Sequence, residues 1–237
     1  MRLPAHHLFT SRDLTLTDSA TEWSAVAASL GVSAARLLLI HQVHGVGVAA
    51  ARRGASASWG RPQADIVMTD DPDVAIGVRV ADCAPILLYD MAHDVAGSVH
   101  AGWRGTAARA AAVAVQALHE AFGSDPRNIV AAIGPCLDVC CGEVGPEVVA
   151  AFRSGNTTSA DMARWFTAGH ADRSYLDLPQ ANVDQLAGAG VPPDQIFDCG
   201  LCTKTYHDRL HSYRAARNGA GRMLGAIRVG SGVRMAR

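Results

Sequence analysis

Two histidines and one cysteine stand where a metal ion could be held between them. His44, Cys83 and His100 each lie at the end of a run of residues predicted to form a β-strand. Two imidazole nitrogens and one thiolate from three separate strand ends suit a catalytic zinc ion, because such sites use three protein ligands and leave the fourth position to water. The sequence therefore predicts a zinc site at His44, Cys83 and His100.

His41 competes with His44 for a place in this site. Both belong to the segment 37–45, which we predict to be a strand because it is short, apolar and ends at Gly45. Side chains alternate across a strand, so we expect His41 and His44 to point to opposite faces. The turn that Gly45 permits favours His44, because it places that imidazole at the strand end.

Cys83 has a second chemical interpretation. Asp82 and Cys83 precede Pro85 between two predicted strands, so a tight connection can present both at a sheet end. Asp82 is the carboxylate nearest in sequence to a predicted ligand, which makes it the candidate proton shuttle of a zinc enzyme. In the alternative, Cys83 is the nucleophile of a thiol hydrolase, His100 its base and Asp82 the group that orients the histidine.

The remaining cysteines form a weaker candidate for a closed metal site. Cys199 and Cys202 have the spacing of half a structural zinc site, and the other half would have to come from Cys136, Cys140 and Cys141. No second pair has the matching spacing. We therefore expect Cys199 and Cys202 to be reduced and mostly packed thiols.

The elements that must position these residues alternate between strands and helices. We predict strands at 65–69, 74–80, 85–90, 94–101, 128–135 and 222–229, and helices at 20–30, 106–122, 146–152 and 178–190, with loops at 52–63 and 153–172. Gly102 and Gly105 bracket Arg104 just before the helix predicted at 106–122, an arrangement that favours an anion. No repeat or linker divides the chain, so the pattern indicates one α/β or α+β domain over residues 1–237.

Composition excludes several classes of protein. The 237 residues contain 21 lysines and arginines against 22 acidic residues, without the basic surplus of a nucleic-acid-binding protein. No apolar run approaches the length of a membrane span, and the first residues lack the pattern of a signal peptide. We therefore expect a cytoplasmic protein without membrane or nucleic-acid partners, and the sequence leaves its oligomeric state open.

Six motifs in a fixed order resemble those of the YfiH family, the bacterial laccase-domain or polyphenol oxidase proteins. The motifs are QVHG (42–45), ADCAPILLYD (81–90), VHAGWRGT (99–106), AIGPC with EVGPEV (132–148), LDLPQANVDQL (176–186) and SYR with GAGRM (212–223). The resemblance implies an α+β fold, a mixed α/β sandwich whose sheets are flanked by helices. It also implies a zinc ion held by His44, Cys83 and His100.

The resemblance further implies an activity. Members of this family split adenosine, inosine, guanosine or methylthioadenosine with phosphate to the free base and ribose 1-phosphate, and also deaminate adenosine. Some bacterial members are connected with peptidoglycan precursors, which would suit the thiol hydrolase. Phosphorolysis requires groups that bind a phosphate dianion, and the candidates are Arg12, Arg104, Arg214 and Arg222.

The family's older name suggests a copper-dependent polyphenol oxidase. A multicopper oxidase needs a trinuclear cluster whose histidines come largely as His-x-His pairs, and this sequence contains no such pair. Copper(II) can still displace zinc from a site of two histidines and one cysteine. We therefore expect copper at this site as an alternative or adventitious metal.

Overall fold

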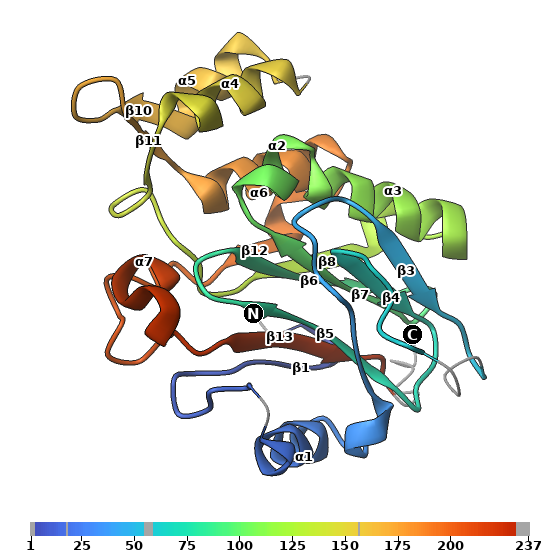
Figure 1. Cartoon of the computed structure of the whole chain (residues 1–237). Helices are drawn as coiled ribbons and strands as arrows, with labels where there is room; N and C mark the ends of the chain where they lie inside the picture. Colours follow the sequence, from blue (N-terminus) through green and yellow to red (C-terminus); the bar gives the residue numbers. More distant parts are fainter. Residues whose placement is uncertain (1–2, 18, 55–58, 156, 231–237) are drawn as a thin grey trace.

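Two β-sheets packed face to face form the centre of the molecule, with helices on both outer faces (Figure 1). This computed structural model describes residues 3–17, 19–54, 59–155 and 157–230. The α+β sandwich expected from the sequence is confirmed.

The smaller sheet has four strands in the order β1-β13-β5-β2. Their bounds are β1 His6–Phe9, β13 Met223–Arg228, β5 Ala75–Val80 and β2 Leu37–Leu39. Strand β13 pairs antiparallel with both β1 and β5, while β2 pairs parallel with β5. The predicted strands at 74–80 and 222–229 are thus neighbours although they lie far apart in the chain.

The larger sheet has six strands in the order β12-β8-β6-β7-β4-β3. Their bounds are β12 Ile196–Asp198, β8 Ile129–Ile133, β6 Ala84–Asp90, β7 Val95–Ala101, β4 Ile66–Thr69 and β3 Val48–Ala51. All residues of β6 and β7 are buried, which explains their nearly continuous apolar sequences.

Alternation along β7 divides its side chains between two cores. Ala96 packs between the sheets with Ile76 of β5 and Leu87 of β6, whereas Val95 and Val99 pack on the outer face. Ser98 lies on the inner face, where its hydroxyl donates to the Gly225 carbonyl of β13 at 3.1 Å. This register places His100, two residues further on, at the end of the inner face.

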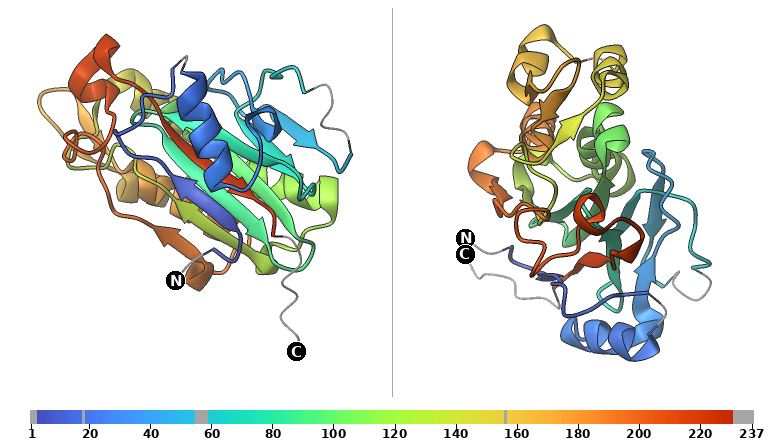
Figure 2. Two further views of the ribbon diagram at one scale, coloured as in Figure 1. Left: turned by 90° about the horizontal axis from the view of Figure 1, so that it is seen from below. Right: turned by 60° about the vertical axis from the view of Figure 1, so that its left-hand side comes forward.

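Helices cover the outer face of each sheet (Figure 2). Helix α1 (Ala20–Ser29) packs on the smaller sheet, and Ser19 caps it as expected by accepting from the amide of Glu22. Helices α2 (Trp103–Ala107), α3 (Ala110–Phe122) and α6 (Leu178–Gly188) cover the larger sheet. None of the helices in the described residues is long and apolar enough to cross a membrane.

The single helix predicted at 106–122 is wrong, because the chain forms α2 and α3 with a break between them. Arg109 adopts a left-handed backbone with φ of 63°. The Thr106 hydroxyl and carbonyl accept from Asn182 and Gln185 of α6 at 3.1 and 2.8 Å. These bonds from a distant helix outweigh the helical propensity of the alanine-rich segment.

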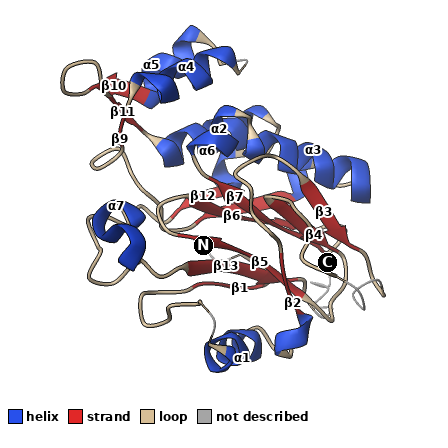
Figure 3. Ribbon diagram, in the orientation of Figure 1, coloured by secondary structure: helices blue, strands red, loops and turns tan. Residues whose placement is uncertain are grey.

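The loop predicted at 153–172 is also wrong in part. Helix α4 (Pro146–Ser154) extends into it, and α5 (Ser159–Trp165) begins with a capping box formed by Thr158 and Asp161. These helices adjoin a small sheet of β9 (Glu143–Val144), β10 (Phe166–Ala168) and β11 (Ser174–Leu176) (Figure 3). Helix α7 (Tyr213–Ala216) lies at the same end of the sandwich in Figure 1.

Candidate functional site

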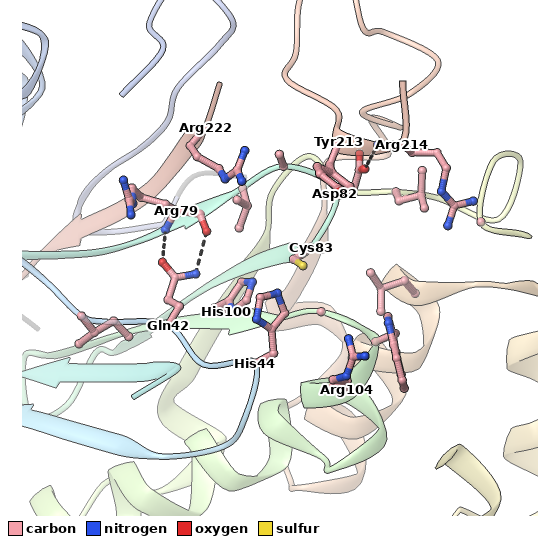
Figure 4. Close-up of a pocket in the computed structure, with 18 of the residues that line it drawn as sticks. Gln42, His44, Arg79, Asp82, Cys83, His100, Arg104, Tyr213, Arg214 and Arg222 are labelled. Carbon is pink, nitrogen blue, oxygen red and sulfur yellow. Dashed lines mark hydrogen bonds between the residues drawn. The ribbon is translucent and has the colours of Figure 1, made fainter. Parts of the chain in front are cut away.

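A cavity of about 880 Å³ opens at one end of the sandwich (Figure 4). The loop after β2, the connection between β5 and β6, and the start of α2 contribute side chains to its wall. His44, Cys83 and His100 all line this cavity. A volume of this size is typical of a small-molecule site.

The three predicted ligands converge in the wall of the cavity. A nitrogen of His44, a nitrogen of His100 and the sulfur of Cys83 all lie within 4.8 Å of one another. The two imidazole rings are nearly perpendicular, at 79°, with 4.8 Å between their centroids. In zinc sites the ligand bonds are about 2.0 to 2.3 Å long, so only small movements of these side chains would enclose a metal ion.

Asp65 organises this group, although no sequence motif indicated it. Its buried carboxylate accepts from Nδ1 of His100 at 2.7 Å, which turns Nε2 of that ring toward Cys83. The same carboxylate accepts from the amides of Val43, His44 and Gly45 at 3.2, 3.0 and 2.7 Å. One side chain therefore orients one candidate ligand and fixes the loop that carries another.

The surroundings of Cys83 favour its ionised form. Burial alone would raise the pKa of the thiol, but hydrogen bonds from His100 and His44 lower the pKa to about 6. Burial likewise opposes protonation of His100, yet Asp65 and Cys83 together raise its pKa to about 9. At neutral pH the metal-free group is thus a thiolate beside a protonated His100. The thiolate is the form in which cysteine binds metals, and His100 must release its proton when a metal ion binds.

Gly102 makes the close approach of these side chains possible. A β-carbon at this position would lie 2.7 Å from Sγ of Cys83 and 3.5 Å from Cδ2 of His44. Gly102 also precedes α2 with φ of −75°, so alanine can adopt its backbone conformation. A side chain here would displace the thiol and not the main chain.

We expect Gly102→Ala to weaken metal binding by at least roughly 10-fold, because the added methyl group pushes the Cys83 sulfur out of position. The measurement is a competition titration with a chelator of known affinity. Gly188→Ala is the control, since no atom lies within 4 Å of the added methyl group there. Equal metal affinities in both variants would show that the space at Gly102 is unimportant.

Asp82 lies beside the candidate ligands but is bound to other groups. It adopts φ of 85°, and its two carboxylate oxygens accept from the Thr203 hydroxyl at 2.6 Å and the Arg214 amide at 2.5 Å. The carboxylate that orients His100 is therefore Asp65, and the expectation that Asp82 does so is wrong. Each oxygen of Asp82 thus already accepts one hydrogen bond, and a proton transferred to Asp82 must use a remaining lone pair.

Three of the four predicted arginines line the cavity. Arg104 and Arg222 approach it from opposite sides in Figure 4, and Arg214 lies at its upper edge. Arg104 lies within α2, not before a helix as expected, and its guanidinium stacks 4.1 Å from the Trp103 ring. Arg12 does not line the cavity, and its guanidinium donates to the His207 carbonyl.

Two further residues of the cavity were not singled out from the sequence. Arg79 interrupts the apolar strand β5 and lines the cavity, a signal that the sequence did contain. Gln42 accepts from the Arg79 amide and donates to its carbonyl, both at 2.8 Å, and so ties the histidine loop to β5. Gln42 thus positions the loop that carries His44.

The expectation that His41 faces away from the site is wrong. Strand β2 ends at Leu39, and His44 adopts a left-handed backbone with φ of 62°, so strand alternation does not continue to these histidines. Both His41 and His44 line the cavity. His44 alone of the two belongs to the group within 4.8 Å.

The other cysteines are free thiols in a different arrangement from the expected one. Cys202 and Cys136 are buried side by side in a parallel bridge, whereas Cys199 is exposed. The prediction that Cys199 is a packed thiol is therefore wrong, because its side chain is exposed. Cys202 instead gathers with Cys140 and Cys141.

Comparisons with known proteins agree on one family. A sequence model described as multi-copper polyphenol oxidoreductase laccase matches residues 16–230. A purine nucleoside phosphorylase of Deinococcus radiodurans is 37% identical over 85% of this chain and 74% of its own length. A purine nucleoside phosphorylase of Bacteroides thetaiotaomicron is 33% identical over 70% of this chain, and the match spans only 60% of that relative.

Further relatives extend the comparison to another activity and to solved structures. Adenosine deaminase RL5, from an unknown prokaryotic organism, is 34% identical over 69% of this chain and 61% of its own length. The crystal structure of the hypothetical protein YfiH from Bacillus licheniformis superposes with a TM-score of 0.82 at 29% identity. That superposition covers 89% of this chain and 80% of the other.

Proposed function

Because the chain belongs to the multi-copper polyphenol oxidoreductase laccase family, we propose that it is a zinc-dependent purine nucleoside phosphorylase that also deaminates adenosine. The observation that carries the proposal is the convergence of His44, Cys83 and His100 in a cavity that arginines also line. The names of the relatives from Deinococcus radiodurans and Bacteroides thetaiotaomicron, and of Adenosine deaminase RL5, support the two activities.

The donor set fits zinc. Two imidazole nitrogens and a thiolate form a set that zinc uses with one position left open, and Asp65 supplies the carboxylate that commonly supports a zinc-bound histidine. When bound, zinc would act as a Lewis acid and lower the pKa of water. His44, Cys83 and His100 are the proposed ligands.

The substrates follow from the two reactions. In phosphorolysis the bond between the base and C1′ of the sugar breaks, a phosphate oxygen bonds to C1′, and the base leaves with a proton. Adenosine, inosine and guanosine give ribose 1-phosphate, and methylthioadenosine gives the corresponding methylthioribose 1-phosphate. Arg104, Arg214 and Arg222 are placed to bind the phosphate dianion. Deamination consumes water and releases ammonia, and proton transfer by Asp82 remains part of the proposal. Adenosine, inosine, guanosine and methylthioadenosine are the proposed nucleosides.

Arg104→Ala is expected to weaken apparent phosphate affinity by about 10- to 150-fold, the loss of one charge-assisted contact worth about 1.5 to 3 kcal/mol. Initial rates of phosphorolysis at varied phosphate measure this effect. The rate of adenosine deamination in phosphate-free buffer should change little, because that reaction consumes water and needs no phosphate. If both activities fall together with the metal still bound, Arg104 supports the site and does not bind phosphate.

A second candidate function rests on Asp65. Cys83, His100 and Asp65 form a hydrogen-bonded row of thiolate, imidazole and carboxylate, the arrangement of a cysteine hydrolase. Such an enzyme, acting on a peptidoglycan precursor for example, would need no metal. Its nucleophile would be the sulfur that the zinc enzyme uses as a ligand.

The deciding experiment combines metal analysis with a panel of purine nucleosides. The purified protein is assayed with and without phosphate, before and after removal of metal by a chelator. The proposed function requires turnover that disappears with the metal and returns with zinc. Restoration by copper alone together with oxidation of a phenol would identify the polyphenol oxidase. Activity that survives chelation but is lost in the Cys83→Ser variant would identify the thiol enzyme.

The extent and location of the protein are part of the same proposal. We propose that residues 1–237 form one catalytic domain and that the enzyme acts in the cytoplasm. The family match over residues 16–230 supports a single catalytic unit.

A further inference from the structure

A second group of metal-ligating side chains lies outside the site already described. The thiol cluster consists of Cys140, Cys141 and Cys202, whose three sulfur atoms all lie within 4.8 Å of one another. None of the three belongs to the group formed by His44, Cys83 and His100, and all six cysteines of the chain are free.

The fold holds the two segments of the thiol cluster together through backbone bonds. The Cys136 amide donates to the Leu201 carbonyl at 3.3 Å, and the Thr203 amide donates to the Cys136 carbonyl at 2.9 Å. These bonds join the turn after β8 to the chain after β12 at the residues on either side of Cys202. The three sulfurs therefore come together because of the tertiary structure, and loading a metal does not require the chain to gather them.

The spacing of the sulfurs suits a thiophilic metal ion. Three sulfurs around one ion at about 2.3 Å would stand roughly 4 Å apart, so the cluster must contract by less than about 1 Å. The Thr205 hydroxyl oxygen lies 3.4 Å from Sγ of Cys140 and 3.6 Å from Sγ of Cys141, beside the space between them. Cys140 is exposed, which gives an ion a route from solvent.

The charges around the thiol cluster match a metal complex with three thiolates. Such a complex carries a net negative charge, because three thiolates exceed the charge of a monovalent or divalent ion. Basic side chains line the hollow that Cys140 and Cys141 share, namely Arg173, Lys204, Arg214 and Arg217. The one acidic residue in that lining, Glu143, is paired with Arg173 at 3.1 Å.

We propose that the thiol cluster is a second metal centre, which binds a thiophilic d10 cation, Zn²⁺ or Cu⁺, through Cys140, Cys141 and Cys202. Soft thiolate ligands select these ions over harder ones. The proposed centre lies next to the cavity of the candidate active site. Leu137 and Gly142 line that cavity on either side of the two adjacent cysteines, and Arg214 donates to the carbonyls of Cys141 and Glu143 at 3.1 and 2.9 Å.

Metal counting in the full-length protein tests the second centre. Under reducing conditions, the His44→Ala/Cys83→Ser variant loses the first group and should still bind one Zn²⁺ or one Cu⁺ per chain. Adding Cys140→Ser and Cys141→Ser should reduce that number to zero. Loading the same proteins with Co²⁺ provides a spectroscopic readout, because thiolate-to-cobalt charge-transfer absorption should remain in the first variant and vanish in the second.

The controls separate loss of the centre from loss of the fold. Cys199→Ser removes an exposed cysteine outside the thiol cluster and should leave the metal count unchanged. Circular dichroism verifies that each variant is folded. If the His44→Ala/Cys83→Ser variant unfolds, the unaltered chain is compared with Cys140→Ser/Cys141→Ser. The unaltered chain should then bind two ions and the variant one.

Three results would overturn the proposal. The first is that the unaltered chain and the Cys140→Ser/Cys141→Ser variant bind the same number of ions. The second is that two of the three thiols resist alkylation until a disulfide reductant is added. The third is a charge-transfer spectrum that depends on Cys83 alone. Because the readout is metal content, an absence of nucleoside phosphorolysis would not affect this conclusion.

Discussion

Replacement of any one of the three proposed ligands should remove the metal from the candidate active site. The variants are His44→Ala, Cys83→Ser and His100→Ala. Each change removes one of three ligands, and a third of a binding free energy of roughly 10 kcal/mol corresponds to a loss of affinity on the order of 100-fold. Elemental analysis after dialysis against a weak chelator measures the remaining metal. Phosphorolysis and deamination should fall together with it.

His41→Ala is the matched control for the ligand variants. His41 lines the same cavity and comes from the same loop as His44, but it lies outside the group whose donor atoms are within 4.8 Å of one another. Its removal should leave the metal in place. Equal loss of metal from His41→Ala and His44→Ala would contradict the assignment of the ligands.

Asp65→Asn should affect both stability and metal binding. The neutral amide presents hydrogens where the carboxylate accepts four hydrogen bonds, from His100 and from the amides of residues 43–45. We expect metal affinity to fall roughly 10- to 100-fold, because His100 loses its orienting partner. Loss of a buried charged partner should also lower the free energy of unfolding by about 3 to 5 kcal/mol. Chelator competition and urea unfolding measure the two effects.

Asp71→Asn separates these two effects. Asp71 is buried like Asp65 and accepts from backbone amides, those of Gly54 and Asp73, but it does not contact a histidine. This variant should be destabilised without a change in the metal affinity of the site formed by His44, Cys83 and His100. If both variants bind metal as the unaltered chain does, the bond between Asp65 and His100 does not support the metal site.

Local patterns in the sequence determined much of the framework. Apolar runs of residues predicted the strands β4, β5, β6, β7, β8 and β13. Capping residues and terminal glycines predicted the helices α1 and α6. These features depend on residues close together in the chain, which is why they can be derived without a structure. Local sequence also marked His44, Cys83 and His100 as candidate ligands, because each stands at the end of a predicted strand.

Contacts between distant segments determine the structural features that local sequence patterns did not predict. The separation of α2 from α3 depends on bonds from Asn182 and Gln185 to Thr106, and no periodicity within residues 106–122 contains them. The orienting carboxylate proved to be Asp65 instead of Asp82 because the register between β4 and β7 places Asp65 beside His100.

The cysteines illustrate the same physical difference. The spacing of Cys199 and Cys202 indicated a pair, but the left-handed turn at Gly200, with φ of 64°, leaves Cys199 exposed while Cys202 is buried beside Cys136. The sequence by itself determined which side chains could bind metals and which segments form strands. Only the tertiary structure decided which of them meet, because that depends on the register of strands and loops far apart in the chain.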